Sequence, residues 1–491
     1  MHHGNTTVGT RLVVILVVGA IGATACGGSD AGPTTTTAPS VVTAATTTEP
    51  PDATEPPTTT APPANTPVVV DTDMGVEGTL SILYLLGRPD IDVRAITISG
   101  TGLVHCEPGV QQALALVALT AGHDIPVACG SEQPLADTHS FPSSWRAVAD
   151  AGYGLDLPEG GASSDLPAPE LLVSAISSAE EPVVVYTDGP LTNLASALRL
   201  DPGIVEGIGA VYSKAGTLDA TGNIIRAPQA EYNIWVDPVA AAEVLGSGLP
   251  LTLVPLDATN QVPLHIFHLR ALEEHQSTPE AAAAVAILAN DDELVGGGLY
   301  FSDQLAAALA VDESLARYET MHLTIVTEGA DFETGQVDRA EQGNEVRVAT
   351  VIDRERVERE FLSSLAGEDV GPIVVDPDFT VEFDGEAWTV DCPPTMPTGD
   401  YVVSFTNRSG GEAGVVFGRL TEDGTEAELL AWTALNQPPF YIIDGTAFAD
   451  PGVTAIAVVT LDEPGTNYLE GLHQDGMDRG AETIGQIEIT G

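Results

Sequence analysis

The chain has few basic residues. Its 491 residues include 17 Lys and Arg against 71 Asp and Glu, which gives a formal net charge of −54 at pH 7, and Lys214 is the one lysine. Such a charge repels phosphate backbones and anionic lipid head groups, so we expect no nucleic-acid partner. The acidity fits either solubility in a salty habitat or a surface that collects divalent cations, and we favour solubility for most of it.

Aromatic residues are also scarce, at 5%, and the longest apolar run near the N-terminus is short. That run covers residues 12–20 after Arg11, which is too short for a comfortable membrane span. A basic flank, a short apolar segment and the small residues before Cys26 predict an export signal. The hydrophobic fraction of 43% supports two or three folded units in a chain of this length.

The small residues that precede Cys26 resemble a bacterial lipoprotein box. The resemblance implies that residues 1–26 carry a lipoprotein signal, with cleavage before Cys26 and a lipid on that cysteine. A plain signal peptide with an incidental cysteine is the alternative. We therefore expect a location on the extracytoplasmic face of a bacterial membrane or cell envelope, with membrane contact through the lipid anchor only.

Three further cysteines follow the export segment. Cys106 and Cys129 come after two successive predicted strands, so they could meet in neighbouring loops and form a disulfide. Cys392 would then remain free.

Residues 27–66 are dominated by Thr, Pro, Ala and Ser. This composition cannot bury enough apolar surface to offset the entropy of ordering, so a disordered, partly polyproline-like tether is predicted. It would hold the folded part away from the membrane.

Strand-like and helix-like segments alternate over residues 67–367. The apolar runs at 68–70 and 183–187 are each followed by acidic or glycine turns and then by helical patterns at 79–86 and 191–200. This alternation is typical of right-handed βαβ units, so an α/β domain with a mostly parallel, doubly wound sheet is predicted.

The pattern changes over residues 368–491. Short alternating runs are separated there by Gly, Pro and Asn turns, which predicts a small all-β sandwich with antiparallel strands. The sandwich resembles a cupredoxin-like module, and His473 and Met477 lie where the end of a copper-binding loop would be. A blue-copper site also needs a nearby cysteine and a second histidine, so we interpret this domain as metal-free.

Residues 67–78, PVVVDTDMGVEG, organise the first domain. A buried strand delivers Asp71 and Asp73 to its carboxyl end, where ligands of open α/β sheets gather. Two carboxylates one residue apart, with Glu77 nearby, repel one another unless a cation or a tight hydrogen-bond network lies between them. The stretch fits half of a metal site or, equally well, a surface turn with an acidic N-cap.

Five segments in order resemble the inosine-uridine-type nucleoside hydrolases: VVVDTDMGVEG, AITISG, DGPLTNLA, AEYNIWVDP and FSDQLAAA. The family's opening signature is D-x-D-P-G-x-D-D. The resemblance covers nearly the whole predicted α/β domain. It implies one calcium ion at the bottom of a ribose-binding pocket and cleavage of the N-glycosidic bond of nucleosides by a calcium-bound water.

The resemblance implies calcium ligands at Asp71, Asp73, Asp188 and Asp303, with Asp188 contributing its backbone carbonyl. Asp73 would also take the proton from the attacking water, and Asp303 would be a second catalytic aspartate.

The ribose hydroxyls would be held by Glu77, Glu231 and Asn233. His139 lies in the loop region that caps the pocket in the family, so it could assist the leaving group. A solvated loop histidine is the more frequent role for such a residue.

Four positions depart from the family pattern. Met74 replaces the signature proline, and Ser302 stands where many members have a histidine. Glu77 occupies the place of a ribose-facing aspartate, and Gly78 occupies the place of a calcium-binding aspartate without offering any side-chain oxygen. Glu77 is one methylene longer and could reach the metal, but it would then leave the ribose.

Three functions follow for the whole chain. The first is an exported, lipid-anchored hydrolase of ribonucleosides. The second is a catalytically impaired surface protein that binds a nucleoside or ribose, and the third is a structural or adhesive envelope protein. The resemblance also implies a possible homo-oligomer.

Overall fold

The computed structural model describes residues 65–490, except 121–123, 136–138, 292, 293, 295, 296, 331, 421–424, 426–428, 430–439, 447, 448, 450, 476 and 477. The predicted export signal, Cys26, nearly all of the predicted tether and Met477 therefore lie outside the described residues. None of the helices in the described part of the chain combines the length and apolarity needed to cross a bilayer.

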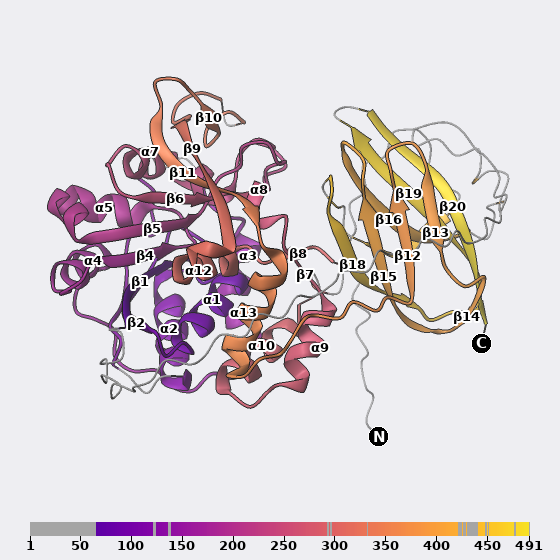
Figure 1. Ribbon diagram of the computed structural model, residues 1–491, viewed down its shortest axis with the longest axis horizontal. Helices are drawn as coiled ribbons and strands as arrows, with labels where there is room; N and C mark the ends of the chain where they lie inside the picture. The colour runs from indigo at the N-terminus through magenta and orange to yellow at the C-terminus, as the bar shows by residue number, and fades with distance from the viewer. Residues whose placement is uncertain are drawn as a thin grey trace, which may run out of the picture.

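The first folded unit is an α/β domain built on one large sheet (Figure 1). In spatial order the strands run β10-β9-β11-β6-β5-β4-β1-β2-β3. They span β1 (Thr66–Thr72), β2 (Ile91–Ile98), β3 (Val127–Cys129), β4 (Val183–Thr187), β5 (Ile208–Lys214), β6 (Leu251–Val254), β9 (Ala316–Ile325), β10 (Val337–Arg339) and β11 (Asn344–Ile352).

Helices cover both faces of this sheet (Figure 1). They are α1 (Val76–Leu86), α2 (Cys106–Thr120), α3 (Ser143–Asp150), α4 (Ala168–Ser177), α5 (Thr192–Leu200), α6 (Tyr232–Val236), α7 (Pro238–Leu245), α8 (Leu256–Thr259), α9 (Ile266–Glu274), α10 (Pro279–Leu288), α12 (Asp303–Val311) and α13 (Arg354–Ala366). Short 3-10 turns lie at η1 (Gly152–Gly154), η2 (Pro202–Gly207) and η3 (Glu313–Leu315), and β7 (Pro263–Leu264) pairs with β8 (Leu299–Tyr300).

The central strand β1 is buried on both faces, because its β-branched side chains alternate between two hydrophobic cores. Val68 and Val70 pack with α1, α2, α12 and α13, whereas Val69 packs with α4, α5 and α7. A strand buried on both sides is typical of parallel sheets. The predicted doubly wound, mostly parallel architecture is confirmed.

The strand order reverses at β1. The chain runs outward from β1 to β2 and β3, then returns to pair β4 with the other edge of β1. Ligands of open α/β sheets bind at such a reversal, beyond the carboxyl ends of the strands. Asp73 and Asp188 follow β1 and β4, so the topology places both at this point.

Two details differ from the predicted pattern. Strands β9 and β10 run antiparallel at one edge of the sheet. Helix α1 begins at Val76 rather than at residue 79, so Glu77 and Gly78 lie in its first turn instead of in the preceding loop.

The second folded unit, which we call the C-terminal β-unit, consists of two sheets whose inner faces share one hydrophobic core (Figure 1). One sheet contains β13 (Trp388–Asp391), β12 (Phe379–Phe383), β15 (Gly399–Asn407) and β18 (Thr454–Leu461). The other contains β14 (Thr395–Pro397), β20 (Asp478–Thr490), β19 (Gly465–Asp475), β16 (Glu412–Leu420) and β17 (Phe440–Gly445).

The alternating sequence pattern suggested that all strands of the C-terminal β-unit are antiparallel. The structure differs from this prediction at two pairs of strands. Strands β12 and β15 pair in parallel, as do β14 and β20. Alternation reports which residues face a core and carries no information on strand direction. The ring of His473 stacks on Phe383, with ring centroids 5.2 Å apart, and Cys392 is a free, partly buried thiol.

The two units contact each other through a small apolar cluster. Phe267 at the start of α9 packs with Val402 of β15 and Ile456 of β18. Tyr300 of β8 packs against the core of the β-unit. Because Tyr300 also lines the pocket described below, the β-unit lies beside the pocket.

Cys106 and Cys129 form a disulfide, as their positions after successive strands predicted. The bond joins the start of α2 to the end of β3.

A buried carboxyl group makes the stability of the β-unit depend on pH. Burial raises the pKa of Glu470 from 4.5 to about 7, against a hydrogen bond from Thr483. Between these values the folded chain holds a proton that the unfolded chain has released. Stability therefore falls as pH rises through this range.

We expect Glu470→Gln to raise the free energy of unfolding of the β-unit by about 1–3 kcal/mol at pH 8 and to change this free energy little at pH 4. Chemical denaturation of the full chain at both pH values measures this difference. An equal effect at the two pH values would contradict the assignment of the proton to Glu470.

Candidate active site

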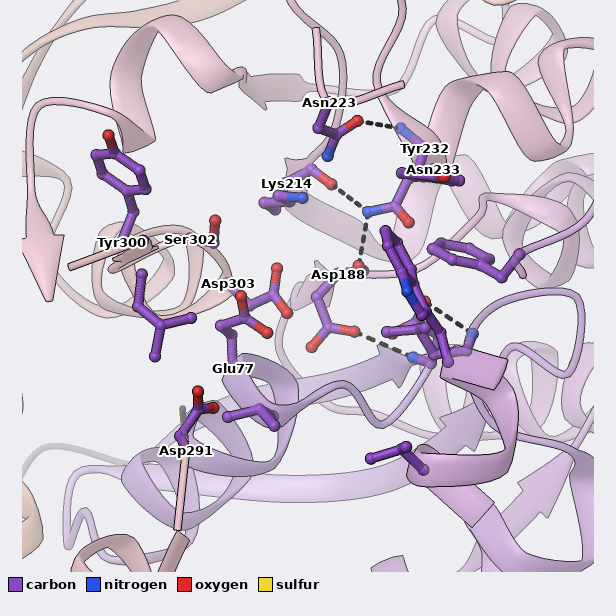
Figure 2. A pocket seen from close by; sticks show the side chains of 18 of the residues that line it. Glu77, Asp188, Lys214, Asn223, Tyr232, Asn233, Asp291, Tyr300, Ser302 and Asp303 are labelled. Atoms are coloured by element: carbon purple, nitrogen blue, oxygen red, sulfur yellow. Dashed lines mark hydrogen bonds between the residues drawn. The ribbon is translucent and has the colours of Figure 1, made fainter. Parts of the chain in front are cut away.

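A pocket of about 920 Å³ opens at the carboxyl ends of β1, β4 and β5. Acidic side chains from separate elements line it, and Figure 2 shows Glu77, Asp188 and Asp303 among them. Four of the acids are Asp73 after β1, Glu77 in the first turn of α1, Asp188 after β4 and Asp303 at the start of α12, and the lining also includes Glu231, Asp291 and Glu412. The topology thus brings together residues more than two hundred positions apart.

Asp73 is fixed by the tight turn between β1 and α1. Its Oδ1 accepts the Gly75 N–H at 3.3 Å and its Oδ2 accepts the Leu103 N–H at 3.2 Å. The turn passes through Met74, whose φ of 56° is one that proline cannot adopt. The turn therefore differs in shape from one built on the signature proline.

Asp188 presents its carboxylate, rather than only its backbone, to the pocket. Its Oδ1 accepts the Asp73 N–H at 3.1 Å, and its Oδ2 accepts the Tyr186 O–H at 2.7 Å. The backbone carbonyl expected to face a metal accepts the Asn233 side-chain amide at 2.7 Å.

Burial raises the pKa of all four carboxyl groups. Burial raises the pKa of Asp73 to about 8, with the charge of Asp188 as the next cause. Burial raises the pKa of Asp188 to about 6, although the hydrogen bond from Tyr186 acts against it. Burial is also the main cause of the raised pKa of Glu77 and Asp303. Uncompensated negative charge of this density favours either protons or a cation.

Lys214 is the one basic residue among the described residues that line the pocket. It ends β5, and its ammonium donates to Glu231 Oε1 at 3.0 Å. Burial acts to lower the pKa of Lys214, but Glu231 and then Asp303 hold it above its ordinary value. The charge of Lys214 also acts to lower the pKa of Asp73, Glu77, Asp188 and Asp303, but a single ammonium cannot neutralise all of these carboxylates.

Glu231 and Asn233, which the sequence comparison predicted to hold the ribose hydroxyls, both line the pocket. Glu231 Oε2 accepts the backbone N–H groups of Gly216 and Asn233, both at 3.0 Å, as the N-cap of α6. The Asn233 amide donates to the carbonyls of Asp188 and Lys214. With both amide hydrogens used, Asn233 offers its Oδ1 as an acceptor.

Asp71 and His139 are not brought to the pocket lining with the other predicted site residues. The Asp71 carboxylate lies beneath the sheet edge, where it accepts from Thr97 at 2.6 Å and Asn193 at 2.8 Å. The His139 ring stacks on Trp235, with centroids 3.8 Å apart, and its Nδ1 lies 2.7 Å from the Trp235 carbonyl.

Several pocket residues were not predicted from the sequence. Aromatic side chains of Phe141, Trp145 and Tyr232 form one wall, with Phe141 stacked on Tyr232 at 4.7 Å. Glu412 reaches the lining from the C-terminal β-unit. Lys214 carried a signal, as the chain's one lysine at the end of a core strand. Phe141 lies in a loop, Trp145 in α3, Tyr232 at the start of α6 and Glu412 in the second unit, and no local pattern marks them as pocket residues.

A second cluster of ligand-type side chains lies elsewhere in the α/β domain. Among the described residues, His265, His268 and Glu358 are buried with ligand atoms within 4.8 Å of one another. Arg354 already donates to Glu358 at 2.5 Å and lies 3.4 Å from His265 Nε2. We interpret this cluster as an internally paired network that joins α9 to α13.

The position of Asp73 depends on Gly102. A Cβ at position 102 would lie 2.2 Å from the Asp73 Cβ, which no packing tolerates. We expect Gly102→Ala to displace Asp73 and to destabilise the fold by about 1–3 kcal/mol. Thermal unfolding measures the effect, with Gly161→Ala as the control because a Cβ there meets nothing within 4 Å. Equal stabilities of the two variants would contradict the close approach.

The Lys214–Glu231 pair gives a second test. We expect Lys214→Met to lower the free energy of unfolding by about 3 kcal/mol, because it leaves a buried carboxylate without its partner. Adding Glu231→Gln to this variant is expected to recover part of the loss. Denaturant unfolding of the single and double variants measures the coupling, and strictly additive effects would show that the pair does not interact.

Comparison with known proteins gives a consistent result. The family model for "Inosine-uridine preferring nucleoside hydrolase" matches residues 68–359. The pyrimidine-specific ribonucleoside hydrolase RihA of Escherichia coli O127:H6 is 33% identical over 203 residues, which cover 40% of this chain and 63% of that protein. An uncharacterized protein of Schizosaccharomyces pombe is 30% identical over 196 residues, 40% of this chain and 62% of that protein. The alignments thus span less than two thirds of either relative.

Solved structures agree with this assignment. A purine-preferring ribonucleoside hydrolase from Gardnerella vaginalis has a TM-score of 0.54 and 25% identity, covering 61% of this chain and 98% of that one. An inosine-uridine preferring nucleoside hydrolase from Bacillus anthracis has the same TM-score at 24% identity, covering 61% and 99%, and shows the shared fold. The chain belongs to the inosine-uridine preferring nucleoside hydrolase family.

Proposed function

We propose that the protein hydrolyses the N-glycosidic bond of ribonucleosides outside the cytoplasmic membrane, where a lipid on Cys26 anchors it. The observation that carries the hydrolase assignment is the convergence of three buried aspartates, the half-buried Glu77 and Asn233 in one pocket of a nucleoside hydrolase-family domain. The extracytoplasmic location rests on the N-terminal sequence alone. We assign the C-terminal β-unit a cupredoxin-like, metal-free supporting role beside the pocket.

We propose ribonucleosides as the class of substrate, without assigning a preference for a purine or a pyrimidine base. The Escherichia coli relative is named for pyrimidine nucleosides and the Gardnerella protein for purine nucleosides. The aromatic wall of Phe141, Trp145 and Tyr232 offers stacking surface that accepts either kind of base.

The donor set fits a hard divalent cation such as calcium. Carboxylate oxygens are the ligands that calcium prefers, and no histidine or cysteine among the described residues lines the pocket. Asp73, Asp188 and Asp303 would hold the ion, with Glu77 next to it. When bound, calcium orients a water molecule and lowers its pKa.

Asp73 is the proposed general base. Its two carboxylate oxygens are held in place by backbone N–H groups, so the carboxylate is fixed where it can accept a proton from a water molecule in the pocket. Asp71 is a positioning residue in this scheme, because its carboxylate ties β1 to Thr97 of β2 and Asn193 of α5.

The remaining groups act on the sugar. Asn233 Oδ1, Glu77 and Glu231 accept hydrogen bonds from ribose hydroxyls, and the anionic pocket stabilises the positive charge that develops on the sugar. The His139 ring stacks on Trp235, and His139 is not among the residues that line the pocket.

The direct test is ribose release from inosine, uridine, adenosine and cytidine by the full chain with calcium. We expect turnover of at least one nucleoside, its loss on chelation and its return with added calcium. Asp73→Asn is expected to lower kcat by about 10²–10⁴-fold, the range for removal of a general base.

Binding without cleavage would support the alternative function. If a nucleoside raises the unfolding temperature of the native protein but stays intact, the protein is a receptor rather than a hydrolase. Turnover unaffected by Asp73→Asn would also contradict the proposed mechanism.

A further inference from the structure

We propose that the Asp188 carboxylate supplies the cation ligand that Gly78 cannot supply. This inference rests on the proposed function, since the cation is the one proposed there. In the family pattern, an aspartate at the position of Gly78, in α1, supplies an oxygen ligand. In this chain the ligand would come from Asp188, which follows β4.

The space beside Gly78 is already filled. A Cβ built on Gly78 would lie 2.9 Å from Asp188 Oδ2, 3.3 Å from its Cγ and 3.0 Å from Thr72 Oγ1. A side chain at position 78 would therefore point into the volume that the Asp188 carboxylate occupies. The glycine and the aspartate are complementary, because only a residue without a side chain on α1 leaves room for the carboxylate.

Asp188 is held in that volume by specific contacts. The Asp73 N–H and the Tyr186 O–H each donate to one of its carboxylate oxygens. Tyr186 comes from β4, the strand that directly precedes Asp188, and its hydroxyl oxygen also lies 3.2 Å from the Asp303 carbonyl oxygen. The same tyrosine thus fixes Asp188 relative to the start of α12, which carries Asp303.

The Asp188 carboxylate also faces the other acidic side chains of the proposed cation site. Asp188, Asp303 and Glu77 point toward one cavity (Figure 2). The Asp188 carboxylate accepts from the Tyr186 and Thr72 side chains and from the Asp73 N–H, and its two oxygens together offer about four lone-pair sites, so one site remains for a further partner. Three aspartates, at positions 73, 188 and 303, therefore remain as proposed ligands, although position 78 has no side chain.

The rearrangement predicts how substitutions combine. Restoring an aspartate at position 78 should not repair the site, because the new side chain would collide with Asp188. Removing the Asp188 carboxylate should weaken cation binding, and making both changes should exchange one ligand for the other.

The experiment is calorimetric titration of calcium into the chelator-treated full chain, with the calcium-induced shift in unfolding temperature as a second readout. We expect Asp188→Asn, which keeps the size of the side chain, to weaken calcium binding by at least about tenfold. Asp291→Asn is the matched control, because it removes one charge from the pocket lining outside the proposed ligands. We expect it to change the Kd less than about threefold.

The exchange variants complete the test. We expect Gly78→Asp alone to bind calcium more weakly than the native chain, and Gly78→Asp with Asp188→Ala to bind within about tenfold of native. Native affinity in Asp188→Asn, tighter binding in Gly78→Asp alone, or no calcium binding by the native chain would each overturn the inference. Ribose release by the native chain reports separately on the proposed function, so the two can fail independently.

Discussion

Repulsion among buried carboxylates is the constraint on which the pocket depends. Asp73, Glu77, Asp188 and Asp303 converge where the strand order reverses, and burial raises the pKa of each. Packing four such groups together costs free energy unless protons, hydrogen bonds or a cation offset it. The backbone N–H groups that hold Asp73 and the Tyr186 hydroxyl that holds Asp188 supply part of this offset.

Lys214 supplies a further part of the offset. Its ammonium is paired with Glu231. Burial raises the pKa of Asp73, Asp188 and Asp303 although the charge of Lys214 acts to lower it. One ammonium thus faces several carboxylates, and the pocket keeps an excess of negative charge that favours a cation. Such an anionic pocket also suits the proposed hydrolysis of a riboside, whose sugar becomes positively charged as the bond breaks.

Much of the fold followed from the sequence, because buried parallel strands have a clear hydrophobic signature. Strand β4 matched its predicted bounds, and the Cys106–Cys129 disulfide formed where adjacent strands place it. The antiparallel direction of β9 and β10 and the parallel pairs of the β-unit were not predicted, since alternation does not encode strand direction. In the pocket, Asp73, Glu77, Asp188, Glu231, Asn233 and Asp303 all reached the lining. The complementarity of Gly78 and Asp188 was hidden, because it depends on a contact across 110 residues that no local motif reports.

The C-terminal β-unit extends the pocket beyond the α/β domain, since Glu412 and the contacts of Tyr300 place it at the lining. The central claim remains that Asp73, Asp188 and Asp303 form a cation site. A crystal structure grown with calcium, with anomalous diffraction measured at long wavelength, tests it most directly. We predict one anomalous peak in contact with the carboxylates of all three aspartates. A peak bound elsewhere, or a pocket in which the Lys214 ammonium occupies that position instead, would contradict the proposed site.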